Sequence, residues 1–173
     1  MVDKSQPVGP GSGAAGCYLL RLTLPESITL VVGKAGSRQF LAGAYLYVGS
    51  AFGPGGVRAR LAHHLRLSQR PHWHIDYLRH HAQVDEIWFA ETDQRLEHTW
   101  ADAVSEMPET VPVLPGLGAS DCRCPTHLFY FSSPPRLATF NEVINRRAEK
   151  KLKSDIGYMM QRWRVRALSN AGV

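Results

Sequence analysis

The sequence contains few cysteines and no long hydrophobic run, and both shortages narrow the classes of protein it can belong to. Only Cys17, Cys122 and Cys124 are cysteines. An odd number without a secretory leader indicates reduced thiols in the cytosol rather than a disulfide framework. No segment reaches the roughly 18 apolar residues of a membrane-spanning helix, and the opening MVDKSQPVGPGSG lacks the apolar core of a signal peptide. These absences predict a cytoplasmic protein.

Acidic residues are scarce near the end of the chain. Residues 133–173 hold nine Lys/Arg and only three Asp/Glu, a net charge of +6, whereas residues 1–132 hold eleven and twelve, a net charge of −1. The basic character is therefore concentrated in residues 133–173. Such a separation of charge suits a polyanion such as nucleic acid as a partner.

The length and composition predict one domain with an appendage. At 173 residues and 44% hydrophobic composition, the chain can bury a sizeable core. The glycine, proline and serine of residues 1–15 predict a disordered leader. Ser132 to Pro135 is a helix-breaking stretch, so the domain is predicted over residues 16–132 and a basic helical tail over 133–173.

Hydrophobic periodicity predicts a mixture of strands and helices. Alternating apolar residues predict strands at 17–24, 28–33, 44–49, 84–92 and 127–131. The first two are expected to pair as a hairpin through a turn at 25–27. Apolar residues at steps of three and four predict helices at 57–67, 73–78 and 95–107, and one long helix over 136–168.

Arg60 and His64 are four residues apart, so on the predicted helix their side chains leave the same face. The preceding turn, SAFGPGG, can bring backbone N–H groups and the helix N-terminus close to an anion. An arginine there can hold a phosphate, and a histidine one turn later can relay a proton near neutral pH. The alternative is a solvated basic face on an ordinary helix.

Three further groups of polar residues are candidates for metal or nucleic-acid binding. Glu97, in the first turn of a predicted helix, either favours the helix dipole or offers a hard oxygen ligand for Mg²⁺. Cys122, Cys124 and His127 offer two thiolates and an imidazole for Zn²⁺, but a zinc site normally has four ligands, so Cys17 or a distant histidine would have to complete it. Six of the eight histidines lie between positions 63 and 81, among them His72 and His74, which are expected at the surface.

Taken together, these residues resemble the GIY-YIG nuclease superfamily. The two signature tripeptides are matched by Gly16-Cys17-Tyr18 and Tyr47-Val48-Gly49, in which cysteine and valine replace the two isoleucines. The helix arginine, the later histidine and the metal-binding glutamate are matched by Arg60, His64 and Glu97. The segments YVGSAFGPGG, HWHIDYL and SDCRCPTHLFYF are more specifically similar to the DUF123-type branch, over about residues 16–131.

The resemblance implies an α+β fold, with a small, mainly antiparallel sheet flanked by helices, and a basic helical extension after it. It also implies a Mg²⁺- or Mn²⁺-dependent DNA endonuclease in which Glu97 holds the metal. The expected catalytic residues are Tyr18, Tyr47, Arg60, His64 and Glu97, with Tyr18, Tyr47 or His64 as the candidate general base; they are expected to converge on one surface cleft. The residues expected to bind DNA are Arg58, His72, His74, Arg146, Arg147, Lys150 and Lys151.

Two other functions remain compatible with the sequence. One is a nucleic-acid-binding module that keeps the fold but cleaves nothing. The other is an interaction domain stabilised by zinc at Cys122, Cys124 and His127.

Overall fold

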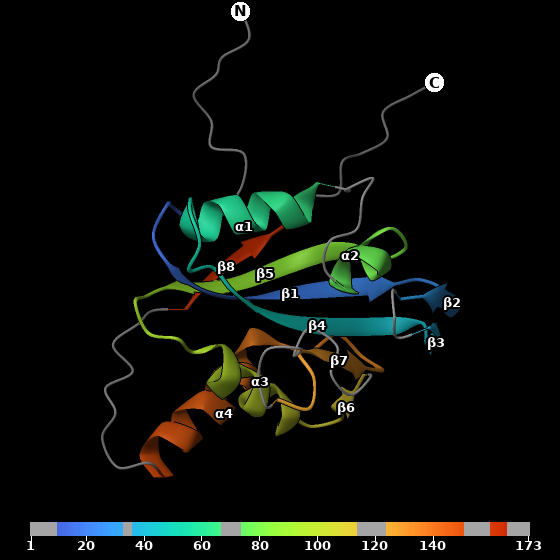
Figure 1. The fold of residues 1–173 in the computed structure, drawn as a ribbon. Helices are drawn as coiled ribbons and strands as arrows, with labels where there is room; N and C mark the ends of the chain where they lie inside the picture. Colours follow the sequence, from blue (N-terminus) through green and yellow to red (C-terminus); the bar gives the residue numbers. More distant parts are fainter. Residues whose placement is uncertain (1–9, 33–35, 67–73, 114–123, 151–159, 166–173) are drawn as a thin grey trace, which may run out of the picture.

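The structure is a six-stranded antiparallel sheet with two helices on each face (Figure 1). In this computed structural model the described residues are 10–32, 36–66, 74–113, 124–150 and 160–165. The sheet has the order β6-β7-β4-β1-β5-β8. Its strands are β1 (Gly16–Leu24), β4 (Gly43–Ser50), β5 (Gln83–Glu91), β6 (Val111–Pro112), β7 (Leu128–Phe131) and β8 (Gln161–Arg164). The predicted α+β class with a mainly antiparallel sheet is confirmed.

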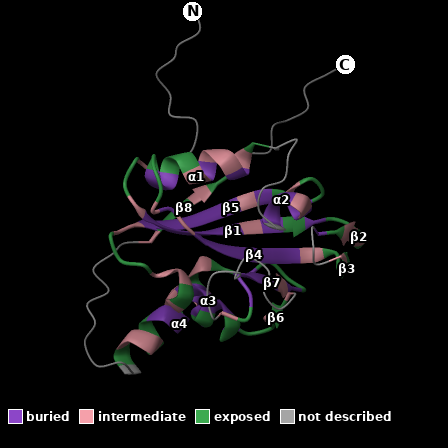
Figure 2. Cartoon of the chain, in the orientation of Figure 1, coloured by how far each residue is buried: buried purple, intermediate pink, exposed green. Residues whose placement is uncertain are grey.

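The central strand β1 separates two hydrophobic cores. Tyr18, Leu20 and Leu22 point into one core, whereas Cys17 and Leu19 point into the other. Successive side chains of a strand leave opposite faces of the sheet. A strand that is covered on both faces therefore shows a nearly continuous apolar run, as in the sequence CYLLRLTL, and Figure 2 shows β1 buried along most of its length.

Helices α1 (Gly56–Leu65) and α2 (His74–Arg79) cover one face of the sheet. Val57 and Leu61 of α1 are fully buried there. They belong to the stripe predicted for this helix from their four-residue spacing. His64 is also buried, with an exposed fraction of 2%. The Arg60–His64 side of the helix is therefore turned partly toward the core, and His64 is not part of a solvated face.

Helices α3 (Glu97–Ser105) and α4 (Leu137–Lys150) cover the opposite face. Trp100 of α3 and Trp88 of β5 both pack on the ring of Phe140 from α4. Outside this core, Arg147 of α4 forms ion pairs with Asp102 of α3 and with Glu106, the residue that follows α3. The two helices are thus joined by aromatic packing and by charge.

The predicted hairpin between the first two strands is wrong. β1 pairs with β4 and β5, whereas β2 (Ile28–Val31) pairs with β3 (Ser37–Phe40) in a separate two-stranded sheet. β1 can exchange ladder hydrogen bonds with only two neighbours, and the longer strands β4 and β5 occupy both of its edges. Closeness in sequence therefore did not decide the pairing.

The long helix predicted over 136–168 is also wrong at residues 161–164. The helix α4 ends at Lys150, residues 151–159 lie outside the described residues, and Gln161–Arg164 forms β8 at the edge of β5. Arg162 and Arg164 lie 3.5 and 3.6 Å from the buried carboxylate of Glu86. The strand is stabilised by its pairing with β5 and by these ion pairs, which a continued helix would not make. Across the described ranges, no helix is long and apolar enough to cross a membrane.

Residues 10–15, the end of the predicted disordered leader, pack against the rest of the fold. The carbonyl of Ala15 accepts a hydrogen bond from Thr92, and Glu91 accepts one from the Ser12 N–H. The carbonyl groups of Ser12 and Ala14 accept from the first turn of α1. The prediction of disorder therefore fails for these residues, while residues 1–9 lie outside the described part of the chain.

Candidate active site

A buried pair, Tyr18 and His64, lies at the centre of the α1 face. The Tyr18 hydroxyl is 2.7 Å from His64 Nε2, and the two ring centroids are 5.4 Å apart. Both side chains have exposed fractions of only 2%. The ring of Tyr47 meets His64 edge-on, with centroids 5.9 Å apart. The structure therefore brings together three of the five residues expected at a catalytic centre.

The protonation states of this pair follow from its burial. Burial lowers the pKa of His64 to about 3, while Asp76 opposes that shift. Burial also raises the pKa of the Tyr18 phenol well above its usual value, and Tyr47 adds to the rise. At neutral pH the imidazole and the phenol are therefore both neutral, because removal from water disfavours their charged forms. A hydrogen bond joins the phenol to His64 Nε2, and its direction is set by which ring nitrogen of the neutral imidazole carries the proton.

The glycine of Tyr47-Val48-Gly49 is required by the Tyr18 ring. A Cβ atom at Gly49 would lie 2.4 Å from both Cζ and the hydroxyl of Tyr18. Tyr18 and Gly49 are directly paired in the β1–β4 ladder, so the ring lies across the backbone of its partner strand. Any side chain at position 49 would push the phenol away from His64. The two tripeptides are thus linked by one steric contact.

Arg60 lines a pocket of about 200 Å³ beside this pair. The wall of the pocket is formed by the turn before α1 and by one side of the helix itself: Ala51, Gly53, Pro54, Gly56, Ala59, Arg60 and His63. His63 lies 3.6 Å from the buried carboxylate of Asp76. The pocket therefore presents one guanidinium and one imidazole to a ligand, whereas Tyr18 and His64 lie outside its wall.

The N-terminus of α1 does not form the expected anion site. Its first N–H groups, those of Gly56, Val57 and Arg58, donate to the carbonyls of Gly53, Ala14 and Ser12 respectively. Gly56 itself has a φ of 55°, and a Cβ there would lie 2.1 Å from the Ala14 carbonyl oxygen. Residues 12–14 therefore occupy the position that the glycine-rich turn was expected to leave for a phosphate. That interpretation of the turn was wrong.

Glu97 lies on the other face of the sheet, in the first turn of α3. Its Oε1 is 3.1 Å from His127 Nδ1, and its carboxylate also accepts a hydrogen bond from Ser50. Burial raises the pKa of this carboxyl, but the hydrogen bonds from His127 and Ser50 outweigh burial, so the net pKa is lowered. Glu97 is therefore an ionised carboxylate held in place by two side chains.

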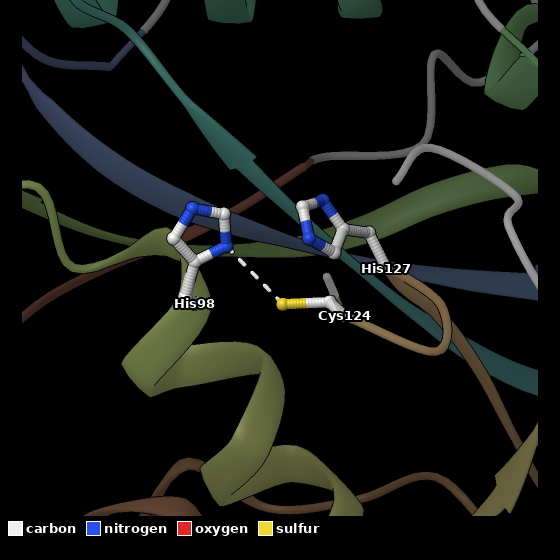
Figure 3. A group of neighbouring side chains, drawn as sticks. All are labelled: His98, Cys124 and His127. Atoms are coloured by element: carbon white, nitrogen blue, oxygen red, sulfur yellow. Dashed lines mark hydrogen bonds between the residues drawn. The ribbon is translucent and has the colours of Figure 1, made fainter. Parts of the chain in front are cut away.

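Cys124 and His127, two of the residues predicted to bind zinc, lie near Glu97. They are accompanied by His98, which the sequence did not single out. His98 Nδ1 is 3.1 Å from Cys124 Sγ, and His127 lies beside both (Figure 3). Cys122 lies outside the described residues. The one signal for His98 in the sequence was its position directly after Glu97. The spacing of Cys122, Cys124 and His127 did not point to it.

The Arg60 pocket and the surroundings of Glu97 approach each other at one end of the sheet. Glu97 contacts Ser50, the last residue of β4, and the next residue, Ala51, lines the Arg60 pocket. Arg60 and Glu97 also both act on the Tyr18 phenol, Arg60 lowering its pKa and Glu97 raising it against the larger effect of burial. The five residues thus lie around one end of the sheet, and Arg60 is the one among them that lines the pocket described above.

The residues expected to bind nucleic acid have different environments. Arg58 is exposed, and its Nε donates to the Gly11 carbonyl at 3.0 Å. Arg146 is exposed on α4, whereas Arg147 is engaged by α3 as described above. His74 begins α2 and Lys150 ends α4, but their side chains lie outside the described residues, as do His72 and Lys151 entirely.

Comparison with known proteins gives one match. The family described as "Domain of unknown function DUF123" matches residues 17–150, which include every described element from β1 to α4. No curated protein and no solved structure matches the chain.

Proposed function

The chain belongs to the DUF123 family over residues 17–150, and from that premise and the site geometry we propose that it is a metal-dependent endonuclease that hydrolyses phosphodiester bonds in DNA. The observation that carries the proposal is the hydrogen bond between Tyr18 and His64, one helical turn from Arg60. This grouping of phenol, imidazole and guanidinium matches the pattern by which the sequence resembles GIY-YIG nucleases.

Arg60 is the residue we assign to the phosphate. Its guanidinium lines the pocket beside the Tyr18–His64 pair. A guanidinium can donate two parallel hydrogen bonds to phosphate oxygens, and its fixed positive charge stabilises the negative charge that develops as water attacks phosphorus. The size of the pocket suits one phosphate group and not a whole nucleotide, so the rest of the DNA would lie outside it.

Tyr18 and His64 are assigned to orienting the attacking water. When the imidazole proton is on Nδ1, Tyr18 donates its hydrogen bond to His64 Nε2, and the lone pairs of the phenol oxygen remain able to accept a hydrogen bond from water. A neutral His64 can then receive the Tyr18 proton if the phenol oxygen takes one from the water. Both groups are buried, so this role requires the surrounding chain to open when DNA binds.

Glu97 is the residue that would hold Mg²⁺ or Mn²⁺. Its lowered pKa keeps the carboxylate charged, and a carboxylate with two hydrogen bonds still has acceptor positions for a metal. A single carboxylate fits Mg²⁺, which commonly binds one or two carboxylates together with substrate phosphates. The metal, when bound, would supply positive charge that stabilises the reacting phosphodiester.

The test is cleavage of end-labelled branched, flapped, nicked and duplex DNAs by the full chain, with Mg²⁺, Mn²⁺ or EDTA. We expect shortened products with either metal and none with EDTA. An Arg60→Ala protein purified in parallel serves as the control for contaminating nucleases. If the folded chain leaves every DNA intact with both metals, the endonuclease proposal is wrong.

A non-catalytic nucleic-acid-binding module is the second candidate, and one observation favours it. Tyr18 and His64 are each only 2% exposed and do not line the pocket, so DNA could be held at Arg60 without reaching them. In that case the same assay would show retarded DNA that is never cut. Failure to bind any of the DNAs would contradict both candidates.

A further inference from the structure

We propose that His98, Cys124 and His127 form a zinc site that fastens the first turn of α3 to the segment leading into β7. The three side chains each direct one ligand atom to the same place, and these atoms all lie within 4.8 Å of one another. They come from two regions of the chain, so an ion held between them would cross-link positions 98 and 124–127. The proposal does not rest on the proposed nuclease activity.

The spacing of the donor atoms suits a tetrahedral ion. Zinc–nitrogen bonds of about 2.1 Å and zinc–sulfur bonds of about 2.3 Å place neighbouring donor atoms roughly 3.4–3.6 Å apart. His98 Nδ1 and Cys124 Sγ are 3.1 Å apart, and no pair in the group exceeds 4.8 Å. Shifts of about 1 Å or less in these side chains would therefore bring the three donors to zinc-binding distances.

The chemistry of the donors selects zinc over the hard cations. A thiolate and two imidazoles are soft or borderline ligands, which favour Zn²⁺, whereas Mg²⁺ and Mn²⁺ favour oxygen. This set differs from the one expected from sequence, because His98 takes part and Cys122 lies outside the described residues. Glu97, to which we assign Mg²⁺ in the proposed reaction, is not in this set, although its carboxylate contacts His127.

The contact between Glu97 and His127 provides a second, independent indication of a metal. Glu97 Oε1 lies against His127 Nδ1, at 3.1 Å. Figure 3 shows that the other ring nitrogen of His127 points toward Cys124 and His98. A histidine that gives one nitrogen to a carboxylate and turns the other toward a thiolate has the arrangement typical of carboxylate–histidine–zinc sites.

Three protein ligands leave one position of a four-coordinate zinc open. A water molecule or a fourth side chain can fill that position. Cys122 is two residues before Cys124 in sequence, so its replacement is a direct way to tell these apart. Loss of zinc in Cys122→Ala would identify Cys122 as the fourth ligand. Retention of zinc would indicate a site of two histidines and one cysteine whose fourth position is open to water. Both results support the site.

The experiment measures zinc in the untagged full chain, by mass spectrometry of the metal, with no DNA or Mg²⁺ present. We expect about one zinc per chain in the natural sequence, and at least a tenfold reduction in His98→Ala and in Cys124→Ala. His81→Ala is the matched control, since His81 is an exposed histidine away from the cluster, and it should retain its zinc.

Two further readouts separate loss of a ligand from loss of folding. A chelator should lower the melting temperature of the natural chain but leave that of Cys124→Ala unchanged, because only a folded state that binds metal is stabilised by it. Cobalt(II) added to the metal-free chain should give thiolate-to-metal absorption that disappears in Cys124→Ala. His98 is exposed, so its replacement is expected to leave the chain folded.

The proposal is overturned if the folded natural chain holds less than a tenth of a zinc per chain after dialysis against zinc. Retention of zinc by either His98→Ala or Cys124→Ala also overturns the ligand set. Because neither result involves DNA, a failed zinc test leaves the endonuclease proposal standing, and a failed cleavage test leaves the zinc site standing.

Discussion

The two faces of the sheet end differ in charge, although their polar residues meet β4 at adjacent positions: Tyr18 pairs with Gly49, and Glu97 contacts Ser50. On the α1 face, Tyr18 and His64 are buried and neutral, and one hydrogen bond joins the phenol to the imidazole. On the α3 face, the Glu97 carboxylate is kept ionised by hydrogen bonds from His127 and Ser50. The same strands thus support a neutral pair on one side and an anion on the other.

The difference in charge arises from the side chains that surround the buried group on each face. Tyr18 is surrounded by apolar side chains of β1, β4 and α1, so a charge there would be poorly solvated. Glu97 lies at the start of α3, where two side chains donate to it and where the helix N-terminus favours a negative charge. We therefore expect substrate-orienting groups on the α1 face and metal ligands on the α3 face.

Replacing Glu97 should have the largest effect of any single change. We expect Glu97→Ala to abolish cleavage while DNA binding persists, because the metal ligand is lost but the basic residues remain. Glu142→Ala, which removes an exposed carboxylate from α4, is the control. Cleavage and gel retardation are measured on the same proteins; substantial cleavage by Glu97→Ala would place the metal elsewhere.

Arg60→Ala should reduce the cleavage rate by roughly 10²-fold, as expected for the loss of one preorganised positive charge on a developing anion. Arg66→Ala, at the other end of the same helix and exposed, should cut at nearly the natural rate. Rates are compared at saturating DNA, so that weaker binding does not enter. If Arg60→Ala and Arg66→Ala cleave DNA at equal rates, the pocket lined by Arg60 has a role other than catalysis.

Acid should destabilise the α1 face through His64. Its pKa is about 3 in the folded chain and 6.5 in the reference state, so below pH 6.5 the unfolded state takes up a proton that the folded state does not. Stability from the neutral imidazole is therefore lost as pH falls, by up to about 1.4 kcal/mol per pH unit. Urea denaturation between pH 7 and 4.5 should show a shallower fall in His64→Gln; parallel curves would contradict the burial argument.

Tyr18→Phe isolates the hydrogen bond of that pair. The ring still fills its space over Gly49, but His64 Nε2 loses its buried hydrogen-bond partner, which should cost about 1–2 kcal/mol of unfolding free energy. The matched control is Tyr130→Phe, whose hydroxyl donates to the Ala42 carbonyl at 3.1 Å near the surface and should cost less. A larger loss in the control would show that the Tyr18–His64 bond contributes little to stability.

The smallest effect is expected from the basic residues of α4. Arg146 is exposed, whereas Arg147 is paired with α3. If Arg146 contacts a phosphate, Arg146→Ala should lower the salt dependence of DNA binding by about 0.9 in log–log slope. Arg147→Ala should instead lower the melting temperature with little change in that slope. Binding measured from low to high salt tests both, and an unchanged slope in Arg146→Ala removes α4 from the DNA-binding surface.

The elements themselves were largely predictable from sequence, because their apolar periodicity reflects local geometry. Strands β1, β4 and β5 and helices α1 and α3 were expected within a few residues of their observed bounds. Strand pairing was not predictable in the same way. The first two strands were expected to form a hairpin, but β4 and β5 pair with β1 instead, and periodicity does not show which strands will compete for an edge. The residues 160–165 showed a helical spacing that was overridden by pairing with β5 and by the charge of Glu86.

The site was predictable as a set of residues but not as a geometry. The sequence pointed to Tyr18, Arg60, His64 and Glu97, yet it gave no measure of burial, so it did not show that Tyr18 and His64 lie beneath the surface. His98 was missed because its partners are more than twenty residues away along the chain and meet it only in the folded state. The helix N-terminus of α1 was misjudged because the carbonyls of Ser12 and Ala14, in a segment expected to be disordered, accept hydrogen bonds from its first N–H groups.

The pairing of β8 with β5 makes the sheet depend on a contact of high sequence separation. Until residues 161–164 arrive, β5 is an unprotected edge strand that can pair with another chain, and the carboxylate of Glu86 lacks two of its three arginine partners. Closing a loop of this length is slow compared with forming local structure. The matched segment 17–150 taken alone would keep that edge open, so its tendency to aggregate, and not its active site, would limit its use as a minimal domain.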